Sequence, residues 1–305
     1  MMHKRLYYFV FALLGAMSCE STADIELAES VPTLVVDAFI NDKAENQQIV
    51  LNFSQPFFDN QQYQPAEGAI ISVTDNQGSE PLLFEASDVP GVYVWEPSSE
   101  RPRIGSVGAE YSLSIEFEGN VFSSTTAMGR TTQVDSILFF EETEPFSDDI
   151  IFEGRISARD SVGVGDAYWI KTFWNGAFLD QPSELNIAFD AGLSAGGEID
   201  GQEFIFPVRT GINPQGEDES YEIGDVVMVE IHSIARETFD YFVELQIQTD
   251  RPGGFAELFA VPLANLPTNI AVENDPDFRV LGFFSVSSVN SLEVEFTEEL
   301  IRGLE

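Results

Sequence analysis

Short runs of alternating apolar and polar residues recur along this chain, and sequences that favour turns separate them. Residues 48–53 place Ile49, Leu51 and Phe53 on one face, as expected of a strand with one buried side. The Asp-Asn-Gln-Gly sequence at 75–78 favours a hairpin turn after a further run of this kind. Many short strands at such spacing predict an immunoglobulin-like β-sandwich over residues 32–130.

Strand patterns continue beyond residue 130. The clearest run, residues 167–174, predicts two faces: Tyr168, Ile170, Thr172 and Trp174 on one, Trp169, Lys171 and Phe173 on the other. We expect residues 131–305 to form a larger β-rich domain. The predicted fold class is therefore mainly β.

One helical pattern interrupts the strands of the second domain, near residues 234–249. Ser233 is a residue type that favours a helix N-cap, and Pro252 follows the expected end of the helix. The apolar face is predicted to contain Ile234, Tyr241, Phe242 and Leu245. We expect this helix to pack on the sheet of its own domain.

The first residues have the pattern of a lipoprotein signal peptide. Lys4 and Arg5 precede an apolar stretch at 6–15, which is too short to span a bilayer as a helix. Small residues then lead to Cys19, which resembles a bacterial lipobox. We expect residues 1–18 to be removed, Cys19 to be lipidated, and residues 19–31 to form a tether. An ordinary secretory signal with an incidental cysteine is the alternative.

Composition excludes several classes of protein. Hydrophobic residues make up 44% of the 305 residues, which is enough for a packed core. The formal net charge of −38 argues against binding the nucleic-acid backbone. A single Cys excludes a disulfide scaffold, and two His exclude a His-rich metal site.

No catalytic motif stands out. His232 is the only histidine after the signal peptide, and we expect it in a capping region or at the surface rather than as a general base. We predict no enzyme activity, no metal and no cofactor. Acidic residues at 217–219 and 273–277 leave calcium open as an alternative, although neither matches an EF-hand loop.

One inter-strand loop carries aromatic residues that suit partner binding. Phe57, Phe58 and Tyr63 lie close together there, next to Asn and Gln residues. Aromatic and amide side chains are common contacts in protein interfaces. Packing of these rings under the loop is the competing interpretation.

Several short motifs, in their order along the chain, resemble one known family. They lie at Cys19 and at residues 32–40, 56–59, 68–73, 91–93, 135–137, 224–226, 233–245, 267–270 and 281–285. Together they resemble the Bacteroidota lipoprotein family called domain of unknown function 4249. The resemblance implies an outer-membrane lipoprotein, often encoded beside TonB-dependent receptors, with no established activity and no catalytic residues to transfer.

These observations lead to one expected function and two alternatives. We expect a non-catalytic, lipid-anchored outer-membrane lipoprotein that is an accessory binding subunit of a TonB-dependent receptor uptake system. Its partners would be the membrane, through the lipid on Cys19, and an outer-membrane β-barrel receptor. A cell-surface adhesion or assembly protein is the first alternative, and a carbohydrate-active enzyme is the second, since two suitably spaced carboxylates suffice for glycoside hydrolysis.

Overall fold

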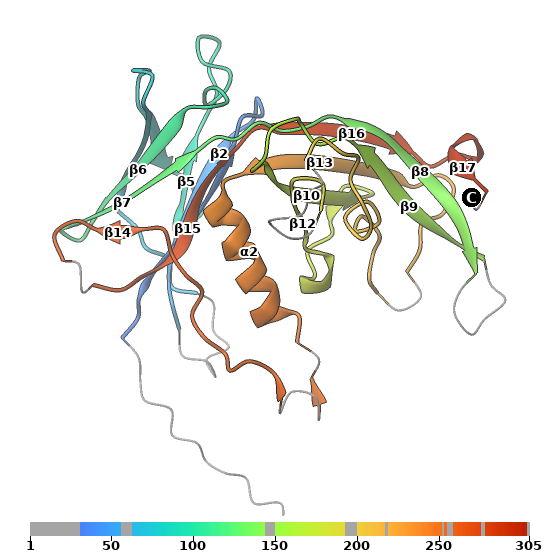
Figure 1. Cartoon of the computed structure of the whole chain (residues 1–305). Coiled ribbons are helices and arrows are strands. Elements are labelled where there is room, and N and C mark those ends of the chain that lie inside the picture. Colours follow the sequence, from blue (N-terminus) through green and yellow to red (C-terminus); the bar gives the residue numbers. More distant parts are fainter. Residues whose placement is uncertain are drawn as a thin grey trace, which may run out of the picture. The chain divides into compact units, whose positions relative to one another are not determined.

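The computed structural model describes residues 31–55, 63–143, 150–192, 200–216, 219–251, 253–254, 259–275 and 278–303. These residues form mainly β-structure, as predicted, and they include one α-helix, α2 (Arg236–Thr249). Figure 1 shows this helix beside the strands β10 and β12, which it contacts. No helix in the described ranges is both long and apolar enough to cross a membrane.

The largest sheet has nine strands in the order β14-β7-β6-β3-β4-β5-β2-β1-β15. The strands are β1 (Leu34–Asn41), β2 (Gln47–Phe53), β3 (Ile70–Asp75), β4 (Leu82–Ala86), β5 (Val92–Trp95), β6 (Glu110–Phe117), β7 (Asn120–Ala127), β14 (Ala271–Val272) and β15 (Val280–Ser287). Strand β4 pairs with β3 through its first residues and with β5 through Glu85 and Ala86. Since β15 also contacts β7, the sheet wraps around one shared core.

Alternation along the strands explains how this core forms. In β1, the side chains of Leu34, Val36, Ala38 and Ile40 are buried in the core. The residues between them point to the opposite face of the sheet. Burial of each large apolar side chain contributes roughly 1.5–3 kcal/mol, so the predicted strand pattern accounts for the stability of this layer.

The first sheet is not built from residues 32–130 alone. Strands β14 and β15 come from the far end of the chain, and β15 pairs with β1 in parallel over its whole length, from Leu34↔Val280 to Asn41↔Ser287. Gly282 has φ +95° and lies against the carbonyl oxygen of Val36, where a Cβ would collide. A glycine is therefore needed for β15 to approach β1 this closely.

Residues after 130 also form two further sheets. One contains β10 (Ala167–Trp174), β11 (Ala177–Phe178), β12 (Asn186–Phe189), β13 (Val226–Ile234) and β16 (Val289–Glu295). The other contains β8 (Val134–Thr143), β9 (Ile150–Ala158) and β17 (Ile301–Arg302). Their shared core includes Tyr168 and Ile170, which confirms one predicted face of residues 167–174.

The helix α2 starts later than the sequence indicates. Ser233 and Ile234 belong to β13, and the N-cap position is Ala235, without a side-chain cap. Ser233 is buried, and its Oγ accepts a hydrogen bond from the backbone N–H of Ser288 at 2.9 Å. The predicted Ser233 cap is therefore wrong, because this hydroxyl group joins β13 to the bend between β15 and β16.

The predicted apolar face of the helix is confirmed. Tyr241, Phe242 and Leu245 all belong to a cluster between α2 and the sheet that contains β10. Phe242 is the most deeply buried of the three, and Phe239 is buried beside them. Ile234 contributes to the same cluster from β13 rather than from the helix.

Candidate ligand-binding site

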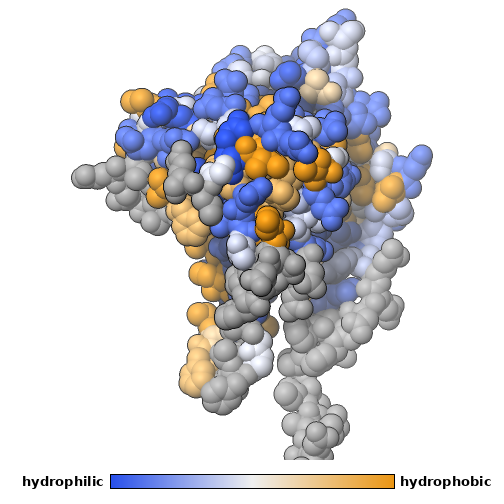
Figure 2. Space-filling model, turned by 90° about the vertical axis from the view of Figure 1, so that its right-hand side faces the viewer, coloured by the Kyte–Doolittle hydropathy of each residue, from blue (hydrophilic) through white to orange (hydrophobic). Residues whose placement is uncertain are grey.

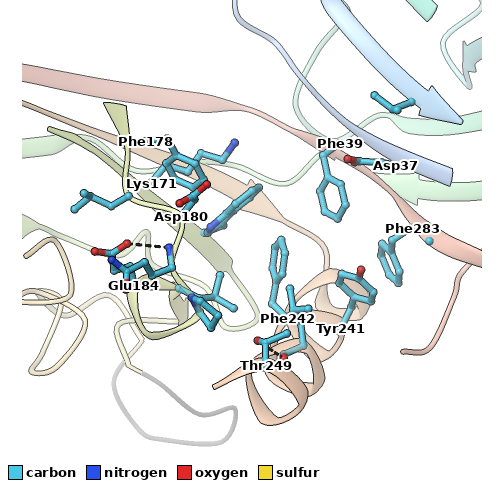
Figure 3. A pocket seen from close by; sticks show the side chains of 18 of the residues that line it. Asp37, Phe39, Lys171, Phe178, Asp180, Glu184, Tyr241, Phe242, Thr249 and Phe283 are labelled. Carbon is cyan, nitrogen blue, oxygen red and sulfur yellow. Dashed lines mark hydrogen bonds between the residues drawn. The ribbon is translucent and has the colours of Figure 1, made fainter. Parts of the chain in front are cut away.

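A pocket of about 660 Å³ lies where three elements meet. Strands β1 and β15 of the nine-stranded sheet form one wall, and β10 with the residues that follow it forms the second. The third wall is α2 (Figure 3). Pockets of roughly 300–1,000 Å³ with mostly apolar walls are typical of small-molecule sites.

Aromatic rings from all three walls form the floor of the pocket. Phe39 of β1 stacks on Phe242 of α2, with ring centroids 5.6 Å apart (Figure 3). Trp169 of β10 lies 4.7 Å from Phe242 and 6.0 Å from Phe39. Tyr241 and Phe283 extend the floor, with their centroids 4.5 Å apart. Such a surface suits a flat or apolar ligand.

The ammonium group of Lys171 lies over this aromatic surface. Its Nζ is 4.0 Å from the ring centroid of Trp169 and 5.4 Å from that of Phe178. Burial lowers the pKa of Lys171, while the charge of Glu230 opposes that shift. Within the described part of the chain, no carboxylate oxygen lies within 4.0 Å of this Nζ. The ammonium is therefore held by rings rather than by an ion pair.

Asp37 is a further charged group of the pocket whose side chain lacks a direct partner among the described residues, as is Asp180. It is on the face of β1 that carries Phe39, and it is open to the pocket. Partial burial raises the pKa of its carboxyl group, and the positive charge of Lys171 opposes the shift. Within the described ranges, the backbone of Asp37 pairs with β2 and β15, but no hydrogen bond or ion pair engages its carboxylate.

Beside Lys171, Glu230 and His232 of the neighbouring strand β13 form a buried group with Lys43 from the turn between β1 and β2. Glu230 is 3% exposed and receives Lys43 Nζ on Oε1 at 2.7 Å and His232 Nε2 on Oε2 at 2.9 Å. Burial alone would raise the pKa of Glu230, but the hydrogen bonds from His232 and Lys43 outweigh it and lower the pKa to about 2. Both carboxylate oxygens are thus engaged.

His232 does not occupy the capping or surface position expected from the sequence. It is 4% exposed, within β13, and its ring centroid is 5.8 Å from that of Trp169. Burial lowers its pKa, so the ring is neutral at pH 7 and donates its Nε2–H to Glu230. Among described side chains, its hydrogen-bond partner is Glu230 and not a nucleophile. The hydrogen bond between His232 and Glu230 therefore has a structural role.

A separate cluster brings together Asp160, Asp190 and Asp200, whose carboxylate oxygens lie within 4.8 Å of one another. Tyr168 donates to Asp160 at 2.6 Å, and the backbone N–H of Gly165 donates to Asp190 at 2.8 Å. Burial raises the pKa of Asp160. No local motif marks this cluster in the sequence, because Asp160 follows β9 while Asp190 and Asp200 follow β12. Of the calcium candidates named there, residues 217, 218, 276 and 277 lie outside the described residues.

The predicted partner-binding residues are only partly described. Tyr63 is 64% exposed and is not among the residues that line the pocket. Phe57, Phe58 and Cys19 lie outside the described residues. On the face shown in Figure 2, hydrophobic side chains lie among hydrophilic ones, so apolar contact surface on this face is interrupted by polar groups.

Sequence reasoning did not find the pocket, although one signal was present. The chain has three lysines, and Lys171 lies in the middle of an aromatic strand. A lysine at such a position is unusual, because burial of an unpaired charge is costly. The distance between β1 and β10 in the sequence concealed the rest of the site.

The sequence model of a family described as Domain of unknown function (DUF4249) matches residues 20–293. The chain belongs to this family. The match spans every strand that lines the pocket, so the domain of unknown function 4249 includes the whole site. No curated protein matches the sequence.

Proposed function

We propose that this protein is a non-catalytic, lipid-anchored outer-membrane lipoprotein that acts as an accessory binding subunit of a TonB-dependent receptor uptake system. The observation that carries the binding role is the aromatic pocket with the unpaired ammonium of Lys171. The lipobox-like sequence that ends at Cys19 supports the lipid anchor.

The chemistry of the pocket favours binding over catalysis. Its floor is aromatic, and His232, the cross-strand neighbour of Trp169, is buried and hydrogen-bonded to a carboxylate that also holds Lys43. A general base must reach a proton of the substrate. His232 is engaged and enclosed and does not act as this base, which supports a binding role for the pocket.

Co-purification from outer membranes tests the receptor partnership. The tagged protein is extracted with mild detergent after cross-linking, and mass spectrometry identifies what it retains. A β-barrel receptor enriched over a tagged, unrelated lipoprotein supports the proposal. Enrichment of peptidoglycan-linked or adhesion proteins without a receptor would contradict it and favour the structural alternative.

A further inference from the structure

We infer that the pocket binds a small zwitterion with an aromatic body, such as an aromatic amino acid, with its carboxylate on Lys171 and its ammonium on Asp37. This inference rests on the proposed binding function and deepens it by naming the class of ligand. It is carried by the unpaired ammonium of Lys171, the unpaired carboxylate of Asp37 and the aromatic floor beside them.

Lys171 supplies the site for a negative group. Its ammonium lies on the faces of Trp169 and Phe178, which stabilise the charge without neutralising it. The carboxylate on the adjacent strand, Glu230, already accepts from Lys43 and His232. A ligand carboxylate would therefore give Lys171 the charged hydrogen bond that it lacks.

Asp37 supplies the site for a positive group. It comes from β1, whereas Lys171 comes from β10, so the two charges stand on different walls. They interact electrostatically but do not form an ion pair. A ligand with both signs of charge would bridge them, and a ligand with one sign would leave one of them unsatisfied.

The remaining charges disfavour a purely anionic ligand. Asp180 also lines the pocket, and the carboxylate of Glu184 is held by the backbone N–H groups of Gln181 and Gln215. The whole chain carries −38, and exposed charges act over roughly 8 Å at physiological salt. A ligand with no net charge avoids this repulsion and still presents a carboxylate to Lys171.

Beside the two charges, the partly exposed rings of Phe39 and Trp169 line the cavity and offer contact to an aromatic body, and Phe242 packs against both from α2. The cavity of about 660 Å³ holds such a ligand with room for a substituent. Offset and edge-to-face ring contacts each contribute about 0.5–1.5 kcal/mol beyond burial. The aromatic floor therefore selects for the aromatic body of the ligand, and the two charges select for its carboxylate and its ammonium.

Calorimetric titration of the full chain tests this with probes that share one indole ring. L-tryptophan carries both charges, indole-3-propionate only the negative one, and tryptamine only the positive one. We expect L-tryptophan to bind about tenfold tighter than either analogue. Lys171→Met should weaken the binding of L-tryptophan and indole-3-propionate and leave that of tryptamine unchanged. Asp37→Asn should weaken the binding of L-tryptophan and tryptamine and leave that of indole-3-propionate unchanged.

Controls separate this inference from the proposed function. Glu85→Gln, an exposed position on β4, should change none of the three affinities, and Lys171→Arg should retain the preference for the carboxylate if Lys171→Met fails to fold. Equal or tighter binding of a singly charged probe overturns the zwitterion assignment and leaves the binding role intact. No binding of any probe overturns the inference, while receptor co-purification judges the proposed function by itself.

Discussion

Lys43 Nζ lies 2.7 Å from Glu230 Oε1, although 187 residues separate the two along the chain. Lys43 belongs to the turn between β1 and β2, and Glu230 belongs to β13. The ion pair therefore ties the nine-stranded sheet to the sheet that carries Trp169 and Lys171. Because the pocket lies between those two sheets, this contact helps to hold its walls together.

Removal of Lys43 should destabilise the fold. In Lys43→Met the buried carboxylate of Glu230 keeps only its contact with His232, and a buried charge with too few partners is costly. We expect the free energy of unfolding in urea to fall by about 1–3 kcal/mol. Arg236→Ala is the control, since it breaks an exposed pair with Asp240 and should cost under about 0.5 kcal/mol. Equal losses in both variants would contradict the structural role of Lys43.

Acid should weaken the fold in a window set by Glu230. Its pKa is about 2 in the folded protein against 4.5 for the free side chain. A lowered pKa means that the unfolded state takes up the proton first, so the stabilisation is present above pH 4.5 and is lost as the pH falls towards about 2.

The measurement is the difference in unfolding free energy between the wild type and Glu230→Gln. That difference should be constant at pH values well above 4.5 and should shrink as the pH falls below 4.5. Subtracting the unfolding free energy of the variant removes the pH dependence that the other acidic residues contribute to both proteins. A difference that does not change with pH would show that Glu230 is not held as a carboxylate.

Phe242 should be a core residue of the helix. It is 4% exposed and packs against Phe39 and Trp169. Phe242→Ala should lower the unfolding free energy by about 3–5 kcal/mol, as for other large-to-small core changes. Ile247→Ala, at a position 45% exposed on the same helix, should cost less than about 1 kcal/mol. A loss below 1 kcal/mol for Phe242→Ala would mean that this face is not packed.

Local patterns predicted the strands well because a strand with one buried face has a period of two residues. The two faces of β10 follow directly from that period, and Trp169 and Lys171 point to the pocket side as the alternation requires. The apolar face of α2 follows in the same way from helical spacing. These patterns specify which face of a strand or helix is buried, but they do not specify which other element packs against that face.

Which strands pair and which elements pack together depends on contacts between distant parts of the chain. The parallel pairing of β1 with β15 needs no hairpin, so no turn sequence marks it. Ser233 was expected at a helix cap, but its partner Ser288 is 55 residues away. Asp37 and Lys171 line one pocket although their strands lie far apart in the sequence, and a single sequence does not reveal that arrangement.

Lipidation of Cys19 is a direct test of the proposed anchor. An alkyne fatty acid should label the wild-type protein and place it in the membrane fraction. The Cys19→Ser variant should be unlabelled and should leave that fraction, since acyl chains provide about 0.8 kcal/mol per buried CH₂. If the variant is still labelled and still sediments with membranes, the lipoprotein interpretation is wrong.

The partner-binding loop gives the last prediction. Tyr63 is 64% exposed, so its removal should cost little stability. A variant in which Phe57, Phe58 and Tyr63 are all changed to Ala should melt like the wild type and yet lose the receptor in co-purification. The wild-type surface is strongly acidic and should keep other acidic proteins away, which leaves apolar and aromatic groups to make the specific contact.

Lys171→Met serves as the matched control, because it alters the pocket and should leave the receptor bound. Early melting of the triple variant would mean that these rings belong to the core. Normal melting with the receptor retained would place the interface elsewhere, and the exposed side of α2 around Ile247 would then be the next surface to change.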